Sequence, residues 1–154
     1  YARRIARGIV NARNETPLTT TGELSSLVDA CVPTREPGKH PATRTFQALR
    51  LFINQELAEL DAVLPQALDM IEPGGRLVII SFHSLEDRRV KRFFHDAAKG
   101  DPFPPDLPIR AKEISPVILR PSKPQRPSDG EISDNPRARS AILRWAQKSP
   151  SGQI

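Results

Sequence analysis

A cluster of polar and ionisable side chains lies in the stretch ISFHSLEDRRVKRFF, residues 80–94, between an apolar run and a basic one. The cluster contains Ser81, His83, Ser84, Glu86 and Asp87. Histidine and carboxylate side chains can transfer protons in catalysis, and hydroxyl groups can hold a reacting group in position by hydrogen bonding. The same residues could instead serve local structure, because Ser84 and Asp87 have the spacing of a helix-capping box. The cluster therefore predicts either a polar pocket or a helix start.

An apolar strand and an amphipathic helix are expected on either side of this cluster. Residues 77–82 are nearly all apolar, which is typical of a strand covered on both faces in a parallel α/β sheet. From Ser84 the apolar residues recur at helical spacing, and Gly100 ends the pattern. Because ligands bind beyond the carboxyl ends of strands in open α/β sheets, the cluster lies where a site is expected.

Two helices are expected in the first third of the chain. Residues 1–13 place apolar side chains inward and arginines outward; an organellar transit peptide is the other interpretation of this acid-free segment. Thr20 or Thr21 can cap a second helix, which Pro33 ends. The chain begins with Tyr1 and not with Met, so we expect it to be an excised piece of a longer protein.

The clearest helical pattern in the chain runs from Phe46 to Ile71, where apolar residues recur at steps of three and four. Pro65 interrupts this pattern, and proline has no N–H to donate inside a helix. We therefore predict two successive helices, with a break between Glu59 and Pro65.

The last third of the chain is expected to be irregular. It holds more than half of the 16 prolines, which suits a long connection. Within it, residues 117–119 are a candidate short strand, and Ser128 has the spacing to cap one helical turn. Residues 137–148 alternate in the manner of a last strand.

Composition limits the classes of function. A net charge of +5 favours a polyanionic partner such as nucleic acid. The single cysteine, Cys31, excludes an internal disulfide and fits a reducing compartment. The three histidines show no metal-ligand spacing with it, so we expect no metal. No apolar run approaches the roughly 20 residues that a membrane span needs.

The order of the expected elements is helices, strand, helix, strand, strand. Only one βα unit is complete, which is too little sheet for an independent α/β domain. We therefore interpret the chain as the second half of an α/β fold whose first strands lie elsewhere.

Three blocks make the chain resemble a known family: HPATRTFQALRLFINQEL, PGGRLVIISFHSLEDRRVKRFF and NPRARSAILR. Together they are similar to the bacterial small-subunit ribosomal RNA cytosine-N4 methyltransferase family, from about Arg3 to Trp145. The resemblance implies a cytoplasmic class I methyltransferase with a Rossmann-like sheet and an all-helical insertion for RNA recognition. It also implies transfer of a methyl group from S-adenosylmethionine (AdoMet) to the N4 amino group of a cytosine in the decoding region of 16S rRNA.

The same resemblance divides the chain into two parts. Residues 1–55 would belong to the helical insertion, and residues 56–154 would be the C-terminal half of the catalytic domain. The family binds AdoMet with a glycine-rich loop after the first strand, and this chain has none. We expect the main cofactor loop in the missing N-terminal half of the same protein, so the chain alone should be inactive. The sequence DPFPPD, residues 101–106, is similar to an amine-binding motif, but we interpret it as a proline-rich loop.

The resemblance also gives the polar cluster a possible role in catalysis. The N4 atom of cytosine is a poor nucleophile because its lone pair is delocalised into the ring. Methylation then needs acceptors that hold the amino group in line and a destination for its proton. His83, with Ser81, Ser84 or Asp87, could shape that pocket. The alternative is that Ser84 and Asp87 only cap the helix and His83 only fills a loop.

A second set of residues is expected to contact rRNA in the small ribosomal subunit. These are polar residues of the long helical pattern, of the loop before it and of the NPRARS block: Lys39, His40, Arg44, Arg50, Asn54, Arg137 and Arg139. They would position phosphates and support a flipped base. The alternatives are a solvated face or ion pairs with Glu56 or Glu59. A non-catalytic RNA-binding or ribosome-assembly module is the competing function.

Overall fold

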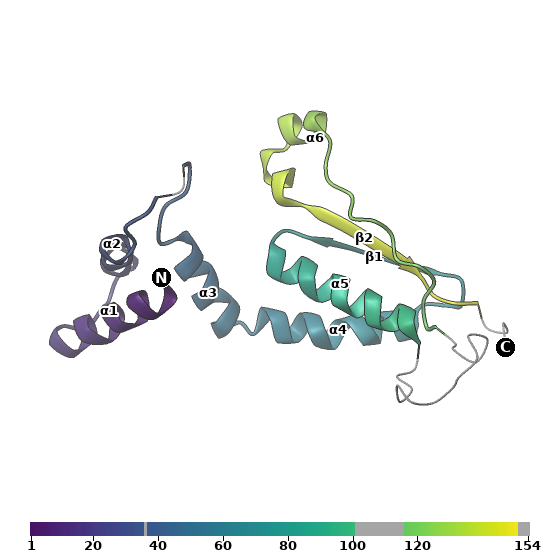
Figure 1. The fold of residues 1–154 in the computed structure, drawn as a ribbon, viewed down its shortest axis with the longest axis horizontal. Coiled ribbons are helices and arrows are strands. Elements are labelled where there is room, and N and C mark those ends of the chain that lie inside the picture. Colours follow the sequence, from purple (N-terminus) through teal and green to yellow (C-terminus); the bar gives the residue numbers. More distant parts are fainter. Residues whose placement is uncertain (36, 101–115, 151–154) are drawn as a thin grey trace. The chain divides into compact units, whose positions relative to one another are not determined.

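The computed structural model describes residues 1–35, 37–100 and 116–150. The chain divides into two compact units, Tyr1–Glu56 and Leu57–Ile154. The helices are α1 (Ala2–Glu15), α2 (Thr21–Cys31), α3 (Thr43–Ile53), α4 (Glu56–Met70), α5 (Ser84–Lys99) and α6 (Asp129–Asp134), the 3-10 helix is η2 (Pro136–Ser140), and the strands are β1 (Arg76–Ser81) and β2 (Ile142–Gln147) (Figure 1). The proline-rich DPFPPD sequence lies outside the described residues.

The first unit is helical. Its α2 helix begins with a capping box: Oγ1 of Thr20 accepts from the N–H of Glu23 at 3.2 Å, and the Glu23 carboxylate accepts from the N–H of Thr20 at 2.9 Å. Of the two capping residues predicted, Thr20 and Thr21, the structure has Thr20 as the cap. Helices α1 and α2 approach closely at Gly8, where a Cβ atom would lie 2.8 Å from Sγ of Cys31. A larger side chain at this position would require the Cys31 side chain or the helices to shift.

The break in the long helical pattern lies at Asn54–Gln55, so the break predicted between Glu59 and Pro65 is wrong. Gln55 has a φ of 53°, in the left-handed region that ends helices. Helix α4 then continues through Pro65. Pro65 lies at an exposed position of this helix, and its missing N–H leaves the carbonyl of Asp61 without its helical partner.

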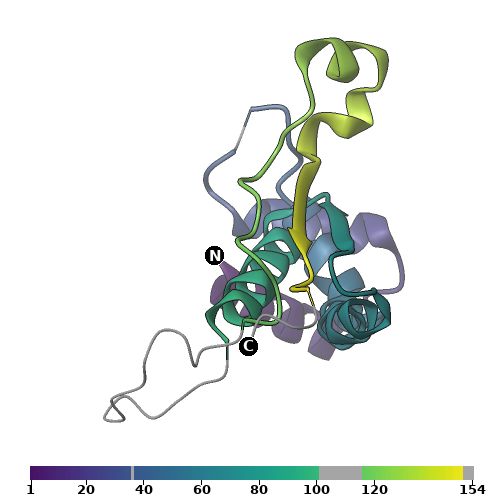
Figure 2. The ribbon, with the colours of Figure 1, turned by 90° about the vertical axis from the view of Figure 1, so that its right-hand side faces the viewer.

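The second unit packs two helices against one face of a two-stranded antiparallel sheet. The pairing of β1 with β2 runs from Arg76↔Gln147 to Ser81↔Ile142. The core lies between the helices and this face, and its buried residues are Leu64 and Leu68 of α4, Val90 and Phe94 of α5, Ile118, and Ala146 of β2. In Figures 1 and 2, α5 runs along the strands while α6 projects beyond the start of β2.

An extended segment lies along the second edge of β2. It forms two isolated antiparallel bridges, Ile118↔Lys148 and Gln125↔Leu143. The short strand predicted at residues 117–119 is therefore only a single bridge. Prolines interrupt this segment, and a residue without an N–H cannot continue a hydrogen-bonded ladder.

The other face of the sheet is apolar and uncovered by the described residues. Val78, Ile80 and Phe82 are each exposed to 54–55%, and Val78 and Ile80 pair across the sheet with Trp145 and Leu143. Among the described residues no strand pairs with the second edge of β1. The sequence predicted a strand covered on both faces, and the described residues cover only one face.

Candidate functional site

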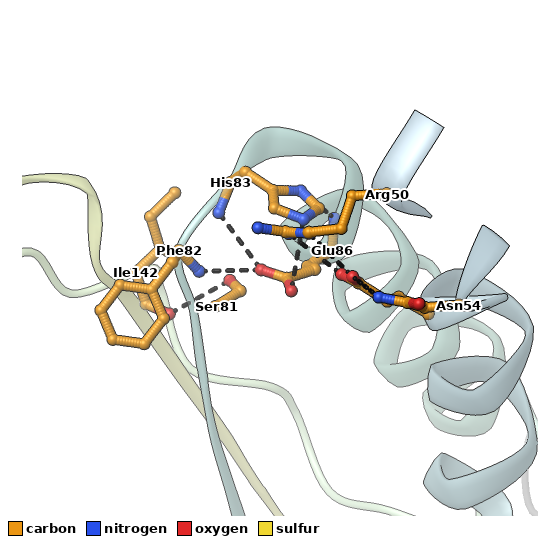
Figure 3. A network of polar contacts seen from close by, with 8 residues as sticks. Arg50, Asn54, Ser81, Phe82, His83, Glu86 and Ile142 are labelled. Carbon is orange, nitrogen blue, oxygen red and sulfur yellow. Dashed lines mark hydrogen bonds and ion pairs between the residues drawn. The ribbon is translucent and has the colours of Figure 1, made fainter. Parts of the chain in front are cut away.

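The carboxyl end of β1 begins with a buried hydroxyl group. Ser81 is the last residue of β1 and is only 4% exposed. Its Oγ donates a hydrogen bond to the carbonyl oxygen of Ile142 at 3.3 Å (Figure 3). This contact ties the end of β1 to the start of β2 and satisfies a polar group that would be costly to bury alone. The Ser81 hydroxyl is therefore used in holding the two strands together.

His83 is the N-cap residue of α5. Its Nδ1 accepts from the N–H of Glu86 at 3.3 Å, and the Glu86 carboxylate accepts from the N–H groups of Phe82 and His83 at 2.9 and 3.2 Å (Figure 3). The capping box is thus His83–Glu86, and the box predicted from Ser84 and Asp87 is wrong by one residue. Ser84 is the first helical residue, is exposed, and makes no side-chain hydrogen bond to any described residue.

The cap determines which ring nitrogen of His83 carries the proton. Because Nδ1 accepts a backbone hydrogen bond, the neutral ring must carry its proton on Nε2. Nε2 is buried, lies 3.3 Å from Oε1 of Glu86, and makes no hydrogen bond within the described part of the chain. The neutral ring can donate at Nε2, but it cannot take up a proton at Nδ1 without losing the cap.

Asp87 forms an ion pair that links α5 to β2. Its two carboxylate oxygens accept from Nε and Nη2 of Arg144 at 2.6 and 3.0 Å, and the two side chains are only 17% and 12% exposed. Paired hydrogen bonds between a guanidinium and a carboxylate are strong and geometrically specific. We did not identify Arg144 from the sequence, where it only alternates with apolar residues in a strand pattern.

The described residues hold no glycine turn in the place expected for AdoMet binding. The turn that contains Gly74 and Gly75 precedes β1, whereas a phosphate- or nucleoside-binding glycine turn follows its strand. Of the four predicted catalytic residues, only Ser84 has a side chain that takes no part in the contacts above. In the described ranges no group of three or more His, Cys, Asp or Glu side chains could hold a metal ion.

Three of the predicted RNA-binding residues line one cavity in the first unit. Lys39, His40 and Arg44 lie around a space of about 630 Å³ that is also lined by apolar side chains of α1 and α3. Nδ1 of His40 accepts from the N–H of Ala42 at 3.2 Å, at the start of α3. His40 therefore shapes the helix start as well as the cavity wall.

Arg50 and Asn54 both contact Glu56 in this unit. Nε and Nη2 of Arg50 donate to the Glu56 carboxylate at 2.8 and 3.0 Å, and Nδ2 of Asn54 donates to the same group at 3.2 Å (Figure 3). This is the internal ion pair that we held open as the alternative to RNA binding. It lowers the charge that Arg50 can offer to a phosphate.

Arg137 and Arg139 lie together on η2 in the second unit. Both side chains are exposed, while Ala138 between them is buried. Oδ1 of Asn135 accepts from the N–H of Arg137 at 3.2 Å and caps this short helix. The capped turn holds two guanidinium groups outward just before β2 begins.

Comparison with known proteins identifies the family of the chain. Residues 1–149 match the model of the MraW methylase family. Relatives named ribosomal RNA small subunit methyltransferase H come from Dechloromonas aromatica and Chromohalobacter salexigens, each 54% identical over 149 residues, and from Coxiella burnetii, 54% identical over 148 residues. These alignments cover 96% of the chain but 48%, 45% and 48% of the relatives, so the chain spans about half their length. Of the described helices, none is both long and apolar enough to cross a bilayer. The chain belongs to the MraW methylase family.

Proposed function

We propose that this chain is part of an AdoMet-dependent methyltransferase that modifies the N4 amino group of a cytosine in the decoding region of 16S rRNA, in the cytoplasm. The observation that carries the proposal is the family match over residues 1–149, together with relatives named as small-subunit ribosomal RNA methyltransferases. AdoMet supplies the methyl group, and the cytosine nitrogen gives up one proton. Residues 1–55 act in RNA recognition and residues 56–154 in catalysis.

The uncovered face of the sheet supports the view that a further part of the protein completes the catalytic domain. Val78, Ile80 and Phe82 form a continuous apolar strip, and an exposed strip beside an unpaired strand edge is a site for association. The curated relatives are about twice as long as the chain. We propose that the other half of their length, on the N-terminal side, adds a strand to β1, covers this strip and supplies the glycine-rich cofactor loop.

The polar groups after β1 divide into supporting and reacting residues in this proposal. Ser81 and Asp87 hold the sheet and helix together through Ile142 and Arg144. His83 fixes the turn as the N-cap of α5. Ser84 is the exposed hydroxyl that can accept a hydrogen bond from the target amino group, which needs an acceptor to hold it in line.

The test uses the longer protein, unmethylated small ribosomal subunits and labelled AdoMet. We expect label in 16S rRNA and N4-methylcytidine after nuclease digestion and mass spectrometry. Binding of the subunit without methyl transfer would overturn the proposal and favour the non-catalytic RNA-binding or assembly module. Label on a different base would refute the assignment of the N4 atom alone.

A pair of serine variants tests the site within this assay. Ser84→Ala should lower turnover at an unchanged melting temperature, because the hydroxyl caps no helix. Ser133→Ala removes another exposed hydroxyl, on α6, that makes no side-chain hydrogen bond to a described residue, and should change neither quantity. If Ser84→Ala keeps full turnover, the amino group is held by other acceptors.

A further inference from the structure

The extended segment beside β2 contains a three-residue repeat. Residues 120–127 read RPSKPQRP, so a cation precedes a proline at Arg120, Lys123 and Arg126. A proline fixes its own φ angle and excludes the helical region for the residue before it. Six of these eight residues are therefore restricted in the backbone conformations they can adopt, and the segment is held extended by its own sequence.

The hydrogen bonds of this segment to β2 follow the same repeat. The N–H groups of Leu119, Ser122 and Gln125 donate to the carbonyl oxygens of Gln147, Trp145 and Leu143, at 2.8, 2.9 and 2.9 Å. Every third residue of the segment is thus hydrogen-bonded to every second residue of β2. The anchoring residue, the cation and the proline each recur at a fixed place in the repeat.

The three cations form one exposed row. Arg120, Lys123 and Arg126 are all exposed, and none of them forms an ion pair or side-chain hydrogen bond with another described residue. Because the row advances in step with alternate residues of a strand, its members are spaced by about 7 Å, twice the rise of about 3.4 Å per residue. Regular spacing of like charges suits a regularly charged polymer better than a single small anion.

We propose that this row, Arg120, Lys123 and Arg126, binds the phosphate backbone of a single-stranded RNA segment. The row begins beside Gln147, at the amino end of β1, and ends beside Leu143, near the Ser81↔Ile142 pair at its carboxyl end. An RNA strand held on the row would therefore lead to the candidate site. The inference rests on the proposed function only for the identity of that RNA.

A proline-binding protein domain is the other partner that such a repeat could attract, since such domains recognise prolines at every third position. Of the three prolines in the repeat, Pro121 and Pro127 are half-buried and Pro124 is exposed, whereas all three cations are exposed. The surface offered to a partner is therefore the charged one, which favours the nucleic acid.

The test measures the salt dependence of RNA binding by the longer protein. Arg120, Lys123 and Arg126 are changed together to Gln, and the dissociation constant for a fluorescent single-stranded RNA is followed against salt concentration. The slope of log K against log salt should become shallower by about 2, because each phosphate contact on a single strand contributes about 0.7. The control changes Lys91, Arg92 and Lys99 of α5 to Gln, which removes the same charge from exposed positions on another element.

The two triple variants give distinct outcomes. A slope change confined to the variant of the row, at an unchanged melting temperature, supports the proposal. Equal slopes for both variants would mean that only net charge matters, and this would overturn it. Methyl transfer by the unsubstituted protein is measured separately, so a loss of the proposed function leaves the binding result interpretable. Binding of a proline-recognition domain with no effect on RNA would favour the other partner.

Discussion

The ion pair between Asp87 and Arg144 predicts a large loss of stability when one partner is removed. In Asp87→Asn the guanidinium would remain buried without its counter-charge. Removing one side of a buried pair costs about 3–5 kcal/mol. Because the Asp87 and Arg144 side chains are still 17% and 12% exposed, we expect a loss of stability at the lower end of this range, about 3 kcal/mol. This corresponds to a fall of about 6–12 °C in melting temperature for a domain of about 150 residues or more.

The same helix provides a matched control. Arg89 of α5 pairs with Asp61 of α4, but those side chains are 39% and 50% exposed. Exposed pairs contribute about 0–1 kcal/mol, so Asp61→Asn should shift the melting temperature little. Thermal unfolding of the longer protein, followed by circular dichroism, measures both variants under one condition. The double change Asp87→Leu with Arg144→Leu should recover most of the loss, because no buried charge is then left unpaired.

Two results would refute this reasoning. Equal melting temperatures for Asp87→Asn and Asp61→Asn would mean that the pair is open to water in solution. An unchanged melting temperature with lost turnover would return Asp87 to the reacting groups. Either result would also remove the link between α5 and β2 from our account of the site.

Three further predictions concern caps and a titrating group. His83→Asn should keep the melting temperature, because asparagine is a good N-cap residue; His83→Ala should lower the free energy of unfolding by about 1 kcal/mol. Lys148→Met should cost about 0.5–1 kcal/mol, because Nζ of Lys148 donates to the carbonyl oxygens of Leu68 and Asp69 at the end of α4. Hydrogen bonds from the N–H groups of Thr20 and then Thr19 hold the pKa of Glu23 below its ordinary value of 4.5. The stability that this carboxylate adds to α2 should therefore be complete above pH 4.5 and be lost as the pH falls through the lower pKa of the folded state.

Each of these predictions has its own measurement. The two His83 variants are compared in melting temperature and in turnover, and an Asn variant that is stable but slow would assign the loss of rate to the imidazole ring. Lys148→Met is compared with Lys123→Met, an exposed lysine that makes no such contact; equal melting temperatures would remove the cap from α4. Carboxyl chemical shifts give the pKa of Glu23, and a value at or above 4.5 would contradict the capping box.

The sequence predicted most helices because their signals are local. The Thr20 cap, the Ser128 cap and the apolar spacing of α5 each depend on residues within one or two helical turns. The position of the α5 cap was wrong by one residue because Glu86 and Asp87 are both acidic and Ser84 is the commoner capping type. His83 caps the helix through a ring nitrogen, which a search for hydroxyl groups overlooks.

The candidate site was harder to predict because its partners are distant in the sequence. Nothing near Asp87 indicates that Arg144 holds it, since the two residues are 57 positions apart. The helix break at Gln55 was missed because Pro65 carries the stronger sequence signal, although an exposed proline is tolerated inside α4. From the sequence, the segment with the row of cations was interpreted only as part of a proline-rich connection. The cations form a regular row only because every third residue of the segment is hydrogen-bonded to alternate carbonyl groups of β2, which the sequence does not show.

The pairing of β1 with β2 also determines when the second unit can fold. The ion pair between Asp87 of α5 and Arg144 of β2 spans 57 positions of sequence, and the hydrogen bond from Gln147 to Gly74, just before β1, spans 73. Loops of that length close slowly, because chain entropy is lost before any contact compensates for it. During synthesis on the ribosome, β1 and the apolar side of α5 must wait for the last residues of β2 to emerge. The nascent chain therefore passes through a stage in which the edge of β1 that pairs with β2 is open, when chaperones would bind it and aggregation would compete with folding.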